Sequence, residues 1–217
     1  PVEGVAIFPP SEPMGWPAAV YKQATVHYFD NKGRMVNTAL PTGGIATSDY
    51  NATNDVVRTL SADNRATALA EAGKTTEASN LLDTKSEYDT VGTELLQTRG
   101  PQHAGKRASG ATVQAREHVR YFYDEGAPEG KTFGLLTKKT DGAEYEGKEG
   151  DVRTALTSYS GQEGLGWTLR KPTATTIDPA GLDLVTKTIY DKFTGNVVET
   201  RSPGGDSEAI YPPAYTS

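Results

Sequence analysis

The chain alternates short apolar and aromatic stretches with polar turns, and one such pattern recurs along its length. Each copy has an aromatic-rich segment that ends in Asp or Asn, a short turn closed by Gly or Asn, and an apolar-polar segment that ends in Thr. Four clear copies occupy residues 28–38, 50–59, 88–98 and 190–200. Because β-branched and aromatic residues on both sides of a short turn favour strands, each copy predicts a β-hairpin.

The turn positions of these copies have separate physical roles. The Asp or Asn side chain can accept hydrogen bonds from the backbone N–H groups that follow it, which nucleates a turn. The closing Gly supplies the positive φ of a short hairpin loop, and Asn is the other residue that tolerates this conformation well. We call these residues the turn signature: Tyr28, Asp30, Gly33, Tyr50, Asn51, Asn54, Tyr88, Asp89, Gly92, Tyr123, Asp124, Gly134, Tyr190, Asp191 and Gly195.

Two further copies are less regular. The spacing from Asp or Asn to the terminal Thr is eight residues in the first two clear copies and nine in the other two, which indicates a longer turn. A fifth copy begins at 121–124 and resumes at 134–140, so the insert 125–133 is expected to be a longer surface loop. A degenerate sixth copy is expected at 157–160, resuming at 166–170.

At these residues the chain resembles the YD-repeat, or Rhs-repeat, family, which includes bacterial polymorphic toxins, shell-forming subunits of insecticidal toxin complexes and animal teneurins. The resemblance covers about residues 26–205 and is clearest at 120–124 and 189–195. It implies an all-β fold in which antiparallel β-hairpin repeats form a curved, spiralling sheet, part of a hollow shell around a toxic C-terminal polypeptide. Residues 178–182 look superficially like the family's self-cleavage element, but a further hairpin follows, so we expect an internal turn.

The composition fits a sheet with many turns. We expect an irregular Pro-rich lead-in at 1–25, a hairpin array at 26–205 and an irregular tail at 206–217, with the array as one continuous unit. A hydrophobic fraction of 35% is low, whereas 23 Gly and 13 Pro are many. A sheet with one wetted face needs few apolar residues. The start without Met and repeats close to both ends suggest a piece of a larger protein.

Residues 61–82 do not follow the hairpin pattern. Ala and Glu enrichment, with Ser61 or Asp63 as N-cap, predicts a helix that ends at Gly73, followed by another turn or two of helix. We expect a short helical insertion that covers one face or edge of the sheet. The alternative is a helix that binds a partner.

Two charged segments also interrupt the pattern. Residues 99–120 carry a local charge of +4, from Arg99, Lys106, Arg107, Arg116 and Arg120 against Glu117. We expect a mobile Gly-rich hairpin loop there, with contact to an anionic partner as the alternative. Residues 141–151 interleave five carboxylates with glycines, for which a solvated loop is expected and a calcium site is the alternative.

The sequence predicts no enzyme, no cofactor and no metal centre. His27, His103 and His118 fit no metal-ligand pattern, and no nucleophile elbow or phosphate-binding glycine loop occurs. The absence of Cys excludes disulfides and Cys-based zinc sites. A net charge of −6 with scattered Lys and Arg argues against a nucleic-acid module. No apolar stretch approaches the roughly 20 residues of a membrane span.

The function expected from these features is a structural scaffold, a segment of a YD-repeat β shell that encloses or presents a polypeptide, such as a C-terminal toxin. It would be secreted or lie at the bacterial cell surface, with other repeats of a parent chain as partners and edge-to-edge self-association through free strands. The alternative is an adhesion or carbohydrate-binding module on the exposed sheet face, for which Trp16 and Trp167 are the best ligand contacts. The Tyr residues are explained more economically by packing between hairpins.

Overall fold

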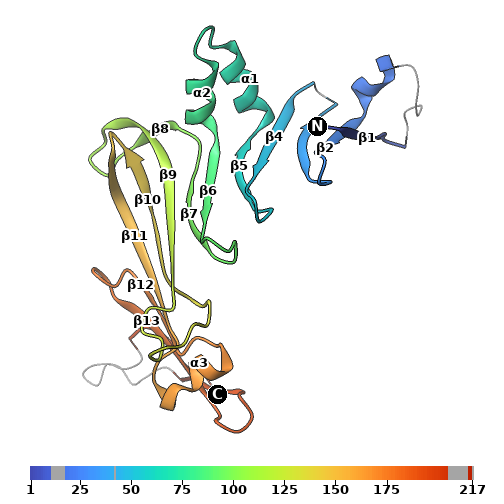
Figure 1. Cartoon of the computed structure of the whole chain (residues 1–217). Coiled ribbons are helices and arrows are strands. Elements are labelled where there is room, and N and C mark those ends of the chain that lie inside the picture. The colour runs from blue at the N-terminus through green and yellow to red at the C-terminus, as the bar shows by residue number, and fades with distance from the viewer. Residues whose placement is uncertain (11–17, 42, 205–214, 217) are drawn as a thin grey trace. The chain divides into compact units, whose positions relative to one another are not determined.

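The fold is an open antiparallel β-sheet with short helices, as the sequence predicts. A computed structural model describes residues 1–10, 18–41, 43–204 and 215–216, so Trp16 and most of the expected tail at 206–217 lie outside the described residues. Among the described residues there are fifteen strands, three short α-helices and two 3-10 helices (Figure 1). The chain divides into two compact units, residues 1–118 with 144–147, and residues 119–143 with 148–217.

In the first unit the strand order follows the chain. Neighbouring strands are β1 (Glu3–Ile7), β2 (Thr25–Phe29), β3 (Met35–Ala39), β4 (Ile45–Tyr50), β5 (Val56–Leu60), β6 (Thr84–Tyr88), β7 (Leu95–Arg99) and β9 (Thr112–Tyr123). The short strand β8 (His103–Lys106) pairs with the start of β9. Pro101, between β7 and β8, has no N–H for the ladder, which explains the break between these two strands.

The second unit continues the same mode of pairing. After β9 come β10 (Leu136–Tyr145), β11 (Lys148–Ser158), β12 (Ala174–Ile177), β13 (Leu184–Tyr190), β14 (Val197–Arg201) and β15 (Tyr215–Thr216). The short helices η2 (Gln162–Gly164) and α3 (Leu165–Leu169) lie between β11 and β12. Residues 178–182 form the turn between β12 and β13, where the Asp178 carbonyl accepts the Gly181 N–H at 3.0 Å.

Four hairpins share a β-bulge at the same position on the second strand. In β2–β3, Tyr28 faces Asn37 and Phe29 faces Met35, so Val36 is an extra residue on the second strand. The equivalent extra residues in the other three hairpins are Val57, Leu96 and Val198. Such bulges increase the local right-handed twist of the strand pair.

The same registers correct one member of the turn signature. Phe29 faces Met35 just as Tyr50 faces Val56, so Phe29 occupies the position that Tyr holds in the other three hairpins. Tyr28 points to the other face, because neighbouring strand residues alternate. Its ring packs against Gly4 of β1, where an added Cβ would lie 3.4 Å from the ring.

The helical insertion forms where the sequence predicts it. Helix α1 (Ala62–Ala70) begins after Ser61, whose Oγ accepts the Asn64 N–H at 3.2 Å. Gly73, with φ 74°, turns the chain into α2 (Thr75–Leu82). The two helices lie side by side beside the sheet of the first unit (Figure 1). Ala68 of α1 is buried, and the turn before β4 approaches α1 so closely that a Cβ on Gly44 would clash with Ala62.

Two segments differ from the sequence-based expectation, and a third matches it. Residues 3–7 of the expected irregular lead-in form β1, because Val5 and Ile7 alternate with small residues that pair with β2; η1 (Ala18–Gln23) follows in the same segment. The acidic residues 141–151 do not form a loop: 141–145 are the end of β10, 148–151 are the start of β11, and Glu146 and Gly147 make the two-residue turn between them. The insert 125–133 contains no strand or helix, as expected.

The prediction of a sixth hairpin copy is wrong. Residues 165–169 form α3 instead of a strand, and β11 pairs with β12. Left-handed backbone at Gly161 and Gly164 turns the chain out of the strand direction before α3. Gly166 then packs so tightly that a Cβ would lie 2.5 Å from the Tyr159 carbonyl oxygen.

Candidate functional site

The hairpin turns bring the Asp or Asn of the turn signature into one recurring set of contacts. In the first hairpin the Asp30 N–H donates to the Arg34 carbonyl at 2.9 Å, and the Asp30 carbonyl accepts the Gly33 N–H at 3.1 Å. The Asp30 carboxylate accepts the backbone N–H groups of Lys32 and Arg34 at 2.8 and 3.0 Å. Equivalent side-chain contacts are made by Asn51, Asp89, Asp124 and Asp191.

The closing residues of these turns all have left-handed backbone. Their φ angles are 75° at Gly33, 73° at Asn54, 74° at Gly92, 65° at Gly134 and 68° at Gly195. Asn54 therefore takes the place of Gly in a conformation that Asn tolerates better than most residues.

Aromatic residues of the turn signature contact neighbouring hairpins. The Tyr50 hydroxyl donates to the Met35 carbonyl at 2.9 Å, and the Arg34 guanidinium lies 4.9 Å from the centre of the Tyr50 ring. Arg34 also donates to the Asn51 carbonyl at 3.1 Å, which connects the first turn to the second. In the second unit the Tyr190 hydroxyl donates to the Pro172 carbonyl at 2.8 Å.

Hydrogen bonding lowers the pKa values of the turn carboxylates. The backbone N–H of Arg34, together with its guanidinium, lowers the pKa of Asp30 to about 2. Backbone N–H donors likewise lower the pKa values of Asp89 and Asp191. Burial raises the pKa of Asp124, but its three backbone donors lower it by more. These carboxylates are therefore held ionised as acceptors within the turns.

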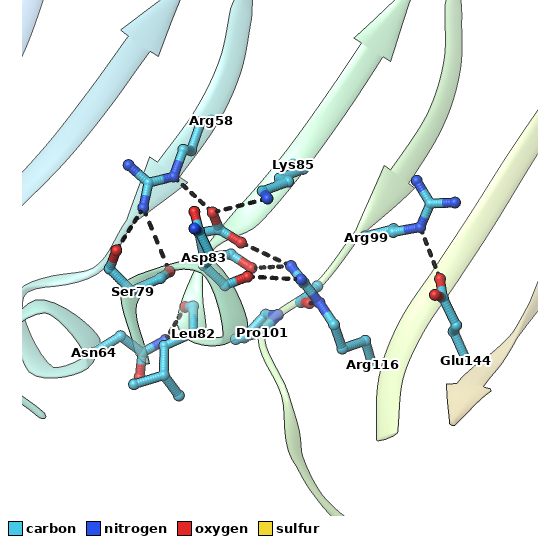
Figure 2. A network of polar contacts seen from close by, with 12 residues as sticks. Arg58, Asn64, Ser79, Leu82, Asp83, Lys85, Arg99, Pro101, Arg116 and Glu144 are labelled. Atoms are coloured by element: carbon cyan, nitrogen blue, oxygen red, sulfur yellow. Dashed lines mark hydrogen bonds and ion pairs between the residues drawn. The ribbon is translucent and has the colours of Figure 1, made fainter. Parts of the chain in front are cut away.

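A second set of polar contacts centres on Asp83, at the junction of α2 and β6 (Figure 2). Its side chain is fully buried, with an exposed fraction of 0%. The carboxylate accepts Nε of Arg58 at 2.6 Å and Nη2 of Arg116 at 2.8 Å, and the Lys85 ammonium lies 3.7 Å away. The Asp83 carboxylate raises the pKa of Arg58. Two arginines from different strands thus compensate one buried negative charge.

The same arginines satisfy the carbonyl groups at the end of α2. A helix leaves its last four C=O groups without partners inside the helix. Arg116 donates to the carbonyls of Asn80 at 2.9 Å and Asp83 at 2.6 Å, and it also donates to Gly100 of the sheet at 2.6 Å. The Asn64 amide of α1 donates to the Leu82 carbonyl at 2.8 Å. The cluster therefore caps α2 and attaches both helices to the sheet.

Further charges lie beside this cluster (Figure 2). Arg99 donates to Glu144 at 2.7 Å, and this hydrogen bond lowers the pKa of Glu144. The buried His118 ring lies 2.8 Å from the Gln97 side-chain oxygen.

Three arginines of the basic segment 99–120 have acidic partners in the structure. Arg99 pairs with Glu144, Arg116 with Asp83, and Arg120 with Glu149 at 3.0 Å. The segment forms the β8–β9 hairpin, in which Arg107 lies 4.6 Å from the centre of the Tyr145 ring. Local positive charge along the sequence is therefore largely compensated in space.

The described residues contain no group of three or more His, Cys, Asp or Glu side chains placed to hold a metal ion. In the acidic segment 141–151, Glu144 and Glu149 point to the arginines named above, which is a different arrangement from a ring of ligands. None of the described helices is long and apolar enough to span a bilayer.

Trp167 does not provide the exposed ring that the carbohydrate-binding alternative requires. Its exposed fraction is 3%, and its ring packs against Phe133 and Tyr159 at centroid distances of 5.1 and 5.0 Å. The indole N–H donates to Ser160 at 3.4 Å. Trp167 is a core residue of the second unit, and Trp16 lies outside the described residues.

The Asp83 cluster was not found from the sequence. Its two arginine partners lie 25 and 33 residues away, so no local spacing indicates them. The bulge did have a signal. Each bulged strand begins with two adjacent apolar residues, such as Met35-Val36 and Leu95-Leu96, where strict alternation would place a polar one.

Comparison with known proteins gives only distant likenesses. No protein-family model matches the chain, and no curated protein matches it. Solved structures with some likeness include a complex of TcdB2, TccC3 and Cdc42, with a TM-score of 0.24 and 12% identity over 88% of this chain. Another is a Photorhabdus luminescens Tc holotoxin pore carrying a mutation in TccC3, with a TM-score of 0.21 and 11% identity over 82% of this chain. The chain spans 12% and 11% of the lengths of these two chains.

The left-handed turn positions lead to a first prediction. Gly33→Ala should destabilise the first unit by about 1–2 kcal/mol, because no side chain lies within 4 Å and backbone strain acts alone. Gly33→Asn should cost less, as Asn54 indicates. Urea unfolding measures both, with Gly105→Ala as control, since Gly105 lies in β8 with open space around it and no positive φ. An equal loss in Gly33→Ala and Gly105→Ala would contradict the assignment.

The lowered pKa of Asp30 leads to a second prediction. Its pKa of about 2 in the folded chain lies below the unfolded value of about 3.9. The ionised carboxylate therefore makes its full contribution to the free energy of unfolding above about pH 4. That contribution is lost as pH falls from about 4 to about 2. Asp30→Asn keeps an acceptor oxygen without the titration, so its stability should fall less over this range. Urea unfolding at several pH values tests this, and parallel curves for both proteins would refute it.

A third prediction concerns Asp83. Asp83→Ala should destabilise the first unit by about 3–5 kcal/mol, because the guanidinium groups of Arg58 and Arg116 lose the carboxylate that compensates their charge. Glu117→Ala removes an exposed carboxylate next to Arg116 in the sequence and should change stability by less than about 0.5 kcal/mol. Arg116→Lys keeps the charge but cannot reach several carbonyls at once, so an intermediate loss is expected. Denaturant unfolding measures these losses. An equal loss of stability in Glu117→Ala and Asp83→Ala would contradict this role of Asp83.

Proposed function

We propose that the chain is a structural scaffold, a segment of a hairpin-built wall that encloses or presents another polypeptide. The observation that carries this proposal is that more large apolar side chains are exposed than hydrophobic residues are buried. Among the described residues eight hydrophobic residues are buried, whereas fifteen large apolar side chains are exposed. In a wall segment, neighbouring repeats and the enclosed polypeptide would cover part of this apolar surface. The role requires no catalysis.

The recurrence of one hairpin geometry supports the same role. Successive hairpins reuse the same turn contacts and the same bulge. In repeat architectures each unit contacts mainly its neighbours, and further units of the same kind can extend the array. Such a wall would act outside the cell or at the bacterial cell surface, with a toxic polypeptide as one class of cargo and other repeats as neighbours.

The first edge of the sheet is suited to receive another strand. β1 pairs with β2, and Val5 and Ile7 of β1 have exposed fractions of 47% and 55%. Edge strands that must stay single usually carry charged side chains, especially Lys, or Pro or a bulge; β1 has a single charge, Glu3 at its first position, and neither Pro nor a bulge. A wall segment needs an edge of this kind.

This edge leads to a fourth prediction. The isolated chain should self-associate as its concentration rises, and the double substitution Val5→Lys with Ile7→Lys should suppress association, because edge lysines disfavour strand pairing. Sedimentation velocity over a concentration series measures this. Leu69→Lys, at a 56% exposed position on α1, is the matched control and should associate like the wild type. A strictly monomeric wild type that binds glycans on an array would favour the adhesion alternative instead.

A further inference from the structure

The two helices of the insertion form a groove of about 290 Å³ on their surface. Its floor is apolar, from Ala78, Leu81 and Leu82 of α2. Leu81 has an exposed fraction of 45%, so part of this floor is open to solvent. Gln102 closes one side, where its N–H donates to the Leu81 carbonyl at 2.7 Å. The groove has the size of a pocket for one long side chain.

Charged residues with an excess of negative charge also line the groove. Glu71, Glu77 and Lys74 line it, which gives these residues a net charge of −1. Within the described residues, neither carboxylate forms a side-chain hydrogen bond or an ion pair. This distinguishes them from Asp83, Glu144 and the turn carboxylates, which all have donors. The groove therefore offers apolar contact and unused negative charge together.

The position of Glu71 is unfavourable for its own helix. Glu71 is the C-cap residue of α1, where the helix macrodipole is negative and a carboxylate is repelled. Glu77, in contrast, lies in the first turn of α2, where a carboxylate stabilises the helix. Helix stability thus explains Glu77 but not Glu71.

We propose that this groove binds a Lys or Arg side chain of a partner polypeptide. The aliphatic stem would pack on Ala78 and Leu81, and the cationic head would lie between Glu71 and Glu77. Long basic side chains bind in this way because their stems are apolar and only their ends are charged. The inference does not depend on the role proposed for the sheet.

The experiment is an NMR titration of the ¹⁵N-labelled chain with hexylammonium and hexanoate, two probes with six carbon atoms each and opposite charge, and with a lysine compound. Hexylammonium should shift the amide signals around Ala78, Leu81 and Gln102 in a saturable way, whereas hexanoate should not. N-acetyl-lysine methylamide should bind at least as tightly as hexylammonium, because the groove is assigned to a side chain on a polypeptide. Equal binding of hexanoate, or no saturable shift with hexylammonium, overturns the proposal. Binding of hexylammonium without the lysine compound overturns the polypeptide assignment.

Variants separate this role from a structural one. Glu71→Gln should weaken hexylammonium binding about 2- to 5-fold, the size expected for one exposed ion pair. The same change should leave thermal stability equal or slightly higher, because it removes charge from the negative end of α1. Glu129→Gln changes an exposed carboxylate in the loop 125–133 of the second unit and should leave binding unchanged. Unchanged binding in Glu71→Gln would refute the proposed site.

Discussion

The buried carboxylate of Asp83 is the constraint on which the first unit depends. The helical insertion interrupts the hairpin array between β5 and β6, and Arg58 and Arg116 reach Asp83 from strands on either side of it. A buried ion pair adds little net stability over an apolar core, yet losing one partner is costly. The same arginines satisfy carbonyls at the end of α2. One charge thereby fixes the position of the insertion on the sheet.

Local features of this fold were predictable, and distant ones were not. Each hairpin is specified within about ten residues by a turn carboxylate or amide and a left-handed closing residue, so the sequence alone indicates it. Asp83 gives no such signal, because its partners become neighbours only when the sheet has formed. The sixth copy failed for a related reason: Gly161, Gly164 and Gly166 allow a compact turn and helix whose packing on Tyr159 is tertiary.

Charges in this chain fall into two groups with different physical roles. Turn carboxylates such as Asp30 are held ionised by backbone donors, and Asp83, Glu144 and Glu149 are paired with arginines. The interactions of these carboxylates stabilise the turns and the strand contacts of the fold. Glu71 is different, because its carboxylate has no hydrogen-bond or ion-pair partner among the described residues and it occupies an unfavourable helix end. The fold thus accounts for these paired carboxylates. It does not account for Glu71 in the helical insertion.

The shared bulge has a consequence for how such a chain can change in length. From each extra residue to the terminal Thr the distance is two positions in all four hairpins, whereas the turns differ by one residue. A residue gained or lost at a hairpin tip leaves the side-chain directions of both strands unchanged. A residue lost at Val36 or its equivalents would move the following side chains of that strand to the opposite face of the sheet. Whole hairpins are therefore the units that can be duplicated or exchanged, and the tips are where they can vary.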